Sequence, residues 1–278
     1  MSFATLEQEC HHSRVSDKQA IADAFSKAAR TYDQHAAFQR EVGQRLMDKL
    51  PNDLSGLSVL DLGCGTGYFT EQLLKRGADV TAFDLSYSML EQCQQRCDGV
   101  MAQSDNVSRV SYQQGDAEDP PFSAASFDII FSSLAIQWCH DLSHLFQMLS
   151  RMLKKEGQCY FSTLLEGSLI ELKRSWSQID KYQHVNQFHQ WDQLNFALAQ
   201  TSAQRYHVDS TEIQVWYDSA FELMKDLKGI GATHVDGRSA GLTKRRSLLD
   251  VEKAYQQFRN PLGQLPATYH VCLGLILK

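Results

Sequence analysis

The chain lacks a long hydrophobic run, because no stretch approaches the roughly 18 consecutive apolar residues of a membrane-spanning helix. Residues 1–10 have no basic segment followed by an apolar run, so we expect no secretory signal and a cytoplasmic protein. Positive charge is not in excess either: 27 Lys and Arg against 33 Asp and Glu give a formal net charge of −6. These absences argue against a membrane partner and against a general nucleic-acid surface.

A disulfide framework is also not indicated, since the seven cysteines are scattered and odd in number. Cys93 and Cys97 share a helix face, and we interpret them as buried, inert thiols. His140 and His144 have the i, i+4 spacing of metal ligands, but no third ligand accompanies them, so we predict surface histidines and no metal. With 43% hydrophobic and 22% charged residues, the 278-residue chain is typical of one soluble domain with an insertion.

The most informative feature that is present is the stretch 57–67, LSVLDLGCGTG, which joins a buried-strand pattern to a glycine-rich turn. A predicted helix over 68–76 follows, and in doubly wound α/β folds such a unit places a ligand at the carboxyl ends of the strands. The glycines have no Cβ atoms to keep the backbone away from that ligand. A dinucleotide site requires G-x-G-x-x-G, whereas this loop reads G-x-G-x-G, with Tyr68 at the third glycine's place.

Asp61 directly precedes this loop, where it would repel a pyrophosphate but suits a cationic amino-acid end such as that of S-adenosylmethionine (SAM). The loop resembles motif I of class I SAM-dependent methyltransferases, with Cys64 as a small residue rather than a nucleophile. A glycine-rich turn can also serve packing alone, so the motif needs support from the rest of the chain. The cofactor-binding residues predicted in this segment are Asp61, Gly63, Cys64, Gly65 and Gly67.

Two further acids follow predicted strands. Asp84 ends the strand 79–84, where an acid accepts hydrogen bonds from a ribose diol. Asp116 follows the strand 108–113, where class I methyltransferases usually hydrogen-bond the adenine amino group. Either acid alone could cap a helix or lie solvated in a loop, but three acids at successive strand ends favour a SAM site. The other residues predicted to complete that site are Leu85, Met89, Ala117 and Ser133.

Strand and helix patterns alternate along the chain, which is the βαβ signature of a mainly parallel sheet. We predict a Rossmann-like class I methyltransferase fold in one domain over residues 1–278, an α/β fold with a seven-stranded sheet flanked by helices. Its parts are amino-terminal helices (16–50), a SAM-binding half (57–165), a helical lid insertion (166–210) and a carboxyl-terminal half (211–278). The strands are predicted near 57–62, 79–84, 108–113, 127–133, 157–164, 213–217 and 268–277.

The insertion separates the fifth and sixth predicted strands and therefore emerges at the end of the sheet where the cofactor is expected. One interpretation is a lid that excludes water during methyl transfer. The other is a helical pair that only completes the core, and periodicity does not distinguish the two.

Three segments extend the resemblance beyond the cofactor motifs: AFSKAARTYD at 24–33, LAIQWC at 134–139 and LKGIGATH at 227–234. They resemble the BioC family of malonyl-acyl-carrier-protein O-methyltransferases of biotin synthesis, and the match runs from about residue 20 to the carboxyl terminus. The resemblance implies that a malonyl thioester carboxylate is esterified with SAM as methyl donor. Because a carboxylate is ionised at neutral pH, no general base is required.

The same resemblance makes Tyr32 the candidate catalytic residue, closing the site around the donor or the acceptor. Tyr32 also lies on the helical stripe of Phe25, so a core tyrosine is the alternative. Gln137 and Trp138 are the predicted substrate-binding residues, although Trp138 could equally be core.

The implied partner is malonyl-acyl-carrier protein, or malonyl-CoA, and the sequence does not choose between them or give an oligomeric state. The densest basic run, 244–246 (KRR), is a candidate docking surface for an acidic carrier, or simply a solvated face. Two other functions stay open. One is a class I methyltransferase for another small acid or hydroxyl acceptor, and the other is a non-catalytic SAM-binding protein.

Overall fold

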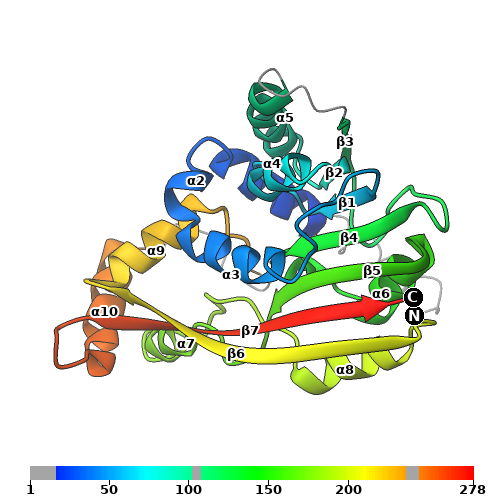
Figure 1. Cartoon of the computed structure of the whole chain (residues 1–278). Helices are drawn as coiled ribbons and strands as arrows, with labels where there is room; N and C mark the ends of the chain where they lie inside the picture. Colours follow the sequence, from blue (N-terminus) through cyan, green and yellow to red (C-terminus); the bar gives the residue numbers. More distant parts are fainter. Residues whose placement is uncertain (1–16, 102–107, 236–243) are drawn as a thin grey trace, which may run out of the picture.

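The computed structural model describes residues 17–101, 108–235 and 244–278. Within them, one sheet has the strand order β3-β2-β1-β4-β5-β7-β6 (Figure 1). The first five strands along the chain pair in parallel, and β7 is antiparallel to both of its neighbours. The predicted seven-stranded, mainly parallel sheet is therefore confirmed. The strands are β1 Ser58–Leu62, β2 Asp79–Asp84, β3 Val110–Gln114, β4 Phe127–Ser133, β5 Leu153–Leu164, β6 Arg205–Tyr217 and β7 Leu265–Leu277.

Helices cover both faces of this sheet. A first helix spans residues 17–28. The labelled helices are α2 Tyr32–His35, α3 Ala37–Met47, α4 Tyr68–Lys75, α5 Tyr87–Met101, α6 Leu142–Met152, α7 Ile170–Trp176, α8 Trp191–Ala199, α9 Ala220–Gly229 and α10 Arg245–Tyr255. Two 3-10 turns, η1 Ile136–Trp138 and η2 Gln256–Phe258, complete the described elements.

The alternation of side chains along β1 assigns the two helical layers. Val59 packs into the core shared with α3, α4 and α5, whereas Leu60 and Leu62 face the core shared with α6 and α8. All three side chains are fully buried. Successive residues of a strand point to opposite faces, so the apolar residues of one short strand can serve two cores. This double burial places β1 inside the sheet, between β2 and β4, with the following loop at its carboxyl end.

The predicted insertion 166–210 is shorter than expected, because residues 205–210 belong to β6. They pair with the carboxyl-terminal end of β7, from Arg205 opposite Leu277 onward. Their side chains are mostly exposed, so this half of the strand has no apolar pattern for a sequence reading to detect. The sixth strand therefore begins at Arg205, not near residue 213.

The insertion divides into two parts with different partners. Helix α8 packs against α6, and its Leu194 and Leu198 are fully buried in the core of that face. The preceding part is joined to the start of β7, where the N–H of Leu169 donates to the carbonyl of Thr268 at 2.6 Å. It returns at His189, which forms a bridge with Leu165. Thus α8 completes the core, and only the segment 165–190 is placed to cover a site.

Strands β6 and β7 extend past the carboxyl end of β5. The β5 ladder ends at Leu164 opposite Val271, while β6 and β7 stay paired as far as Tyr217 opposite Leu265. Helices α9 and α10 lie beside this projecting end (Figure 1). The projection adds a wall at the edge of the sheet where the strands from β1 to β5 terminate.

Candidate active site

A cavity opens at the carboxyl ends of β1, β2 and β4, and we call it the loop cavity. It has about 660 Å³ of space free of atoms, part of it open to solvent. Eight of the predicted cofactor residues line it: Gly63, Gly65, Asp84, Leu85, Met89, Asp116, Ala117 and Ser133. Residues from the ends of four strands, β1, β2, β3 and β4, thus meet around one space.

Asp84 is held in place by the backbone around it. Its Oδ2 atom accepts a hydrogen bond from the N–H of Gly65 at 2.9 Å, and its Oδ1 atom accepts one from the N–H of Ser86 at 2.8 Å. Burial raises the pKa of this carboxyl to about 6, although these hydrogen bonds oppose the shift. At neutral pH it is therefore an oriented carboxylate with acceptor capacity left for a ligand.

Two glycines of the loop serve different purposes. Gly65 has φ of +54°, and a Cβ added there would meet no protein atom within 4 Å, because it would enter the loop cavity itself. Gly67 has φ of +81°, and its added Cβ would lie 2.5 Å from the Sγ atom of Cys93. Gly65 therefore leaves room for a ligand, whereas Gly67 allows the start of α4 to pack against α5.

Three predicted cofactor residues, Asp61, Cys64 and Gly67, do not line the loop cavity. Asp61 is only 2% exposed and accepts a hydrogen bond from the Thr70 hydroxyl at 2.6 Å. Burial raises its pKa to about 7. These residues face the core and not the loop cavity. A contact between Asp61 and a bound amino group therefore stays a prediction.

The first helix supplies residues that the sequence interpretation missed. Lys18, Ile21 and Phe25 all line the loop cavity. None of the three was predicted as a site residue: Phe25 was noted only for its helical stripe with Tyr32, and Lys18 had no predicted contact with the site. The Nζ atom of Lys18 lies 3.0 Å from an Asp116 oxygen and 2.6 Å from a Glu118 oxygen. This one side chain ties the helix to the loop after β3.

Glu118 completes this ionic contact. Burial alone would raise its pKa, but hydrogen bonds from Lys18 and from the N–H groups of Asp141 and His140 lower it to about 2. His140 also faces Glu118, with Nδ1 at 3.4 Å. Removing Lys18 would leave two neighbouring carboxylates without their cation. We therefore expect this contact to help hold the first helix over the loop cavity, together with the packing of Phe25 on Trp138.

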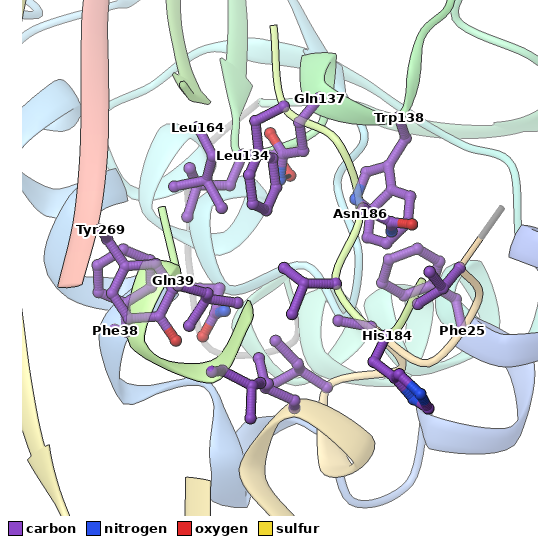
Figure 2. Close-up of a pocket in the computed structure, with 18 of the residues that line it drawn as sticks. Phe25, Phe38, Gln39, Leu134, Gln137, Trp138, Leu164, His184, Asn186 and Tyr269 are labelled. Atoms are coloured by element: carbon purple, nitrogen blue, oxygen red, sulfur yellow. Dashed lines mark hydrogen bonds between the residues drawn. The ribbon is translucent and has the colours of Figure 1, made fainter. Parts of the chain in front are cut away.

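A second cavity lies beside the first, and we call it the apolar cavity. It has about 720 Å³ of space free of atoms, part of it open to solvent. Figure 2 shows Phe38, Gln39 and Tyr269 on one side of it and Phe25, Trp138 and Asn186 on the other. Leu169, Leu172 and Val185 belong to the segment 165–190, which therefore does wall a cavity next to the predicted cofactor site.

The two cavities share one wall, formed by Phe25, Tyr32, Leu134 and Trp138. The rings of Phe25 and Trp138 meet edge to face, with centroids 5.3 Å apart. Tyr32 is half-buried between the cavities, and burial together with the nearby Asp84 and Asp33 carboxylates raises its pKa. Its phenol is neutral at physiological pH and can donate a hydrogen bond. The sequence analysis left a core role open for Tyr32 and for Trp138. In the structure, both side chains lie at the wall shared by the two cavities.

The string at 227–234 is explained by close packing under this shared wall. Gly231 has φ of +80°, and an added Cβ there would lie 3.0 Å from the Cα atom of Phe25. His35 joins α2 to α9, since its Nδ1 atom lies 2.7 Å from an Asp226 oxygen. Leu227, Ile230 and Ala232 then line the apolar cavity. In the sequence, these residues indicated only a family resemblance. The structure shows that they form part of the wall of the apolar cavity.

The thiols and the potential metal ligands of the described residues do not form a reactive cluster. Six described cysteines are free thiols, all buried, and Cys93 and Cys97 are among them. The described residues contain no group of three His, Cys, Asp or Glu side chains suited to hold a metal ion. In the same residues, no helix combines the length and apolar character needed to cross a bilayer.

Solved structures with a similar fold and a matching family model support this architecture. The YcgJ protein of Bacillus subtilis superposes with a TM-score of 0.57 at 18% identity, covering 86% of this chain and 98% of that one. Phosphoethanolamine N-methyltransferase 2 of Haemonchus contortus, solved with S-adenosyl-L-methionine, gives 0.57 at 19% identity over 91% of this chain and 57% of that one. A family model described as a methyltransferase domain matches residues 60–161. The protein is a class I methyltransferase.

Sequence relatives define the family more closely. The malonyl-[acyl-carrier protein] O-methyltransferases of Serratia marcescens and Yersinia pestis are 41% and 40% identical, over 94% of this chain and over 96% and 92% of theirs. The bifunctional biotin biosynthesis protein BioHC of Cellvibrio japonicus is 41% identical, and the chain spans half of its length. The chain belongs to the malonyl-[acyl-carrier protein] O-methyltransferase family, which confirms the resemblance found in the sequence.

Proposed function

We propose that this enzyme esterifies the free carboxylate of a malonyl thioester, with SAM as methyl donor, at the start of pimeloyl and biotin synthesis. The names of its relatives support this reaction. One structural observation carries the proposal: the loop cavity, which has charged side chains in its lining, and the apolar cavity meet at a common wall that includes Tyr32. A donor in the first and an acceptor in the second would be in contact there.

The residues of the loop cavity fit a nucleoside with an amino-acid side arm. The open space at Gly65 would leave room for the cofactor close to the protein backbone, and the Asp84 carboxylate, oriented by the Gly65 N–H, would be an acceptor for two ribose hydroxyls. Leu85 and Met89 provide apolar contacts for an adenine ring, with Asp116 beside them. When bound, SAM would supply the methyl group of its sulfonium: a bond would form between the carboxylate oxygen and the methyl carbon as the carbon–sulfur bond breaks, with S-adenosylhomocysteine as the leaving group.

The protein's part in this reaction is to orient and to exclude water. A carboxylate acceptor is already ionised at neutral pH and needs no base. The neutral phenol of Tyr32 is suited to donate a hydrogen bond at the shared wall, and Gln137 and Trp138 are suited to place the acceptor. The segment 165–190 covers the apolar cavity. Alignment and desolvation then lower the barrier to in-line displacement.

A carrier protein is the proposed source of the thioester, with malonyl-CoA as the alternative. Lys244, Arg245 and Arg246 are exposed at the start of α10, which packs on α7 and α9 behind the apolar cavity. An acidic carrier would be attracted to this run. Reversing the three charges should raise KM for the malonyl-carrier protein and leave SAM affinity unchanged, whereas unchanged kinetics would reject this docking surface.

The decisive experiment incubates the protein with SAM and, separately, with malonyl-carrier protein, malonyl-CoA, free malonate and other small acids. Mass spectrometry should show the gain of one methyl group on a malonyl thioester. Methylation only of unrelated acids or hydroxyl compounds would instead favour the second candidate, a class I methyltransferase for another small acceptor. Calorimetry tests whether the protein binds SAM. If no binding were detected at millimolar SAM, the proposed methyltransferase activity would be rejected.

A further inference from the structure

One polar atom in the wall of the apolar cavity has no hydrogen-bond partner. The Oε1 atom of Gln39 is buried, and nothing in the described part of the chain donates to it. Gln39 stands in the first turn of α3, directly after Phe38, whose ring stacks on Tyr269 with centroids 4.0 Å apart. Figure 2 shows the Gln39 carboxamide next to these two rings at the cavity. A buried acceptor without a donor is costly, so a site that keeps one has a use for it.

The other amide and imidazole groups of this cavity are already engaged. Gln137 donates from Nε2 to the carbonyl of Leu134 at 2.6 Å, and Asn186 donates from Nδ2 to the carbonyl of His234 at 2.9 Å. The Nε2 atom of His184 lies 2.9 Å from an Asp180 oxygen. Gln39 differs from these three side chains because its acceptor oxygen is fully buried and yet has no donor among the described residues.

The chemistry of the ligand follows from what it must donate. An acceptor oxygen needs an N–H or O–H group. Gln39 does not line the loop cavity, so the cofactor's hydroxyl and amino groups are not its natural partners. A malonyl thioester has a carboxylate, a methylene group and a thioester, none of which carries such a proton at neutral pH. The donor must therefore belong to the arm on the far side of the sulfur.

We propose that the Gln39 Oε1 atom accepts a hydrogen bond from an amide N–H of the thioester arm, so that Gln39 recognises an acyl thioester of a pantetheine type. In such an arm, the first amide nitrogen stands two methylene groups beyond the sulfur. Leu169, Leu172 and Val185 of the cavity provide apolar contacts for those methylenes. This inference rests on the proposed function, and it adds which part of the acceptor the enzyme recognises.

Two synthetic acceptors isolate this hydrogen bond. One is the malonyl thioester of N-acetylcysteamine, and the other is the malonyl thioester of 2-mercaptoethyl acetate, in which an ester oxygen replaces the amide N–H. The wild-type enzyme should prefer the amide by about fivefold in kcat/KM, with the difference mainly in KM, since one hydrogen bond is exchanged. In Gln39→Met, which removes the acceptor but keeps the length of the side chain, the preference should fall to within about twofold.

A control variant lies on the same helix. Gln44 donates to Asp48 at 2.7 Å and does not line the apolar cavity, so Gln44→Met should keep the full preference. Gln39→Leu serves as a second variant if Gln39→Met is poorly folded, with Tm as the check. Malonyl-CoA and malonyl-carrier protein share the arm, so both should lose the same factor in Gln39→Met. Their relative kcat/KM in the wild type identifies the preferred carrier.

The outcomes separate this inference from the proposed function. Equal wild-type kcat/KM for the two synthetic thioesters would overturn the role of Gln39 and leave malonyl methylation standing. A preference retained in Gln39→Met and Gln39→Leu would do the same. Methylation of other acids with no malonyl thioester turned over would overturn both.

Discussion

The loop cavity and the apolar cavity meet at one wall, but the chain builds them in different ways. Apart from the first helix and Tyr32, the loop cavity comes from the single stretch 63–139, whose contributing residues lie at or shortly after the ends of β1, β2, β3 and β4. The apolar cavity takes its residues from α3, the end of β5, the segment 165–190, the end of α9 and β7. A local chain pattern therefore encodes the first site, whereas the second exists only once distant segments have packed.

The two cavities also differ in charge. Lys18, Asp84 and Asp116 line the loop cavity, while the described lining of the apolar cavity contains no Lys, Arg, Asp or Glu. A carboxylate that enters the apolar cavity meets neutral donors there, not a cation from the described lining. Weak pairing of this kind preserves the nucleophilicity of the oxygen that accepts the methyl group. Under the proposed function, charged side chains would contribute to binding of the donor, whereas shape and neutral polar groups would bind the acceptor.

The largest effect that tests this division is expected at Asp84. The variant Asp84→Asn keeps one acceptor oxygen for the Ser86 N–H but removes the negative charge offered to the ribose hydroxyls. Because two charge-assisted hydrogen bonds would be weakened, Kd for SAM should rise about 100-fold. Asp79→Asn at the start of the same strand, where Asp79 accepts from the Arg109 N–H at 2.8 Å, is the matched control. Calorimetry measures both values. A change of less than about fivefold in Asp84→Asn would reject the ribose role.

The second test fills the apolar cavity only. Ala232 lines it and does not line the loop cavity. Ala232→Phe should lower kcat/KM for a malonyl thioester about 30-fold by occupying the acceptor's space, with an unchanged Kd for SAM. Steady-state kinetics and calorimetry on the same preparation provide the comparison. If SAM affinity fell equally, the two cavities would not be separable sites.

The third test is aimed at the shared wall. Tyr32→Phe removes only the phenol hydroxyl, so kcat should fall about tenfold through the loss of one hydrogen bond. SAM affinity should change little. Tyr68→Phe is the control, since Tyr68 lies near the loop but lines neither cavity. Equal kcat values for wild type and Tyr32→Phe would return Tyr32 to the role of a packing residue.

The smallest expected effect is on pH dependence. The pKa of Asp84 is about 6, above the unfolded-state value of 3.8. As pH falls from 7.5 to 5.5, its carboxylate is protonated, and Kd for SAM should rise about fourfold. The sign for the unliganded fold is the opposite: because the folded state binds the extra proton, Asp84 contributes more stability as pH falls from about 7 toward 4. Kd that stays constant over this range would argue against the carboxylate as the ribose acceptor.

Individual residues show where sequence reasoning succeeds and where it stops. Asp84 and Asp116 were found because an acid after a predicted strand is a local signal. Lys18 was missed because its partner Asp116 is 98 residues away in the sequence, and nothing near Lys18 announces the contact. Residues 205–210 were assigned to the insertion because both faces of that half of β6 are largely exposed. The first residue of the predicted amino-terminal helices, Ser16, lies outside the described residues.

The sequence by itself determined the α/β fold, the glycine loop, the acids at the strand ends and the family, because each of these depends on spacing within a short stretch of chain. Only the tertiary structure decided which residues meet. It placed Asp61 behind the loop, set Tyr32 between two cavities, divided the insertion between core and cover, and left the Gln39 acceptor facing the apolar cavity. These outcomes depend on packing between segments far apart in the chain, which no local pattern records.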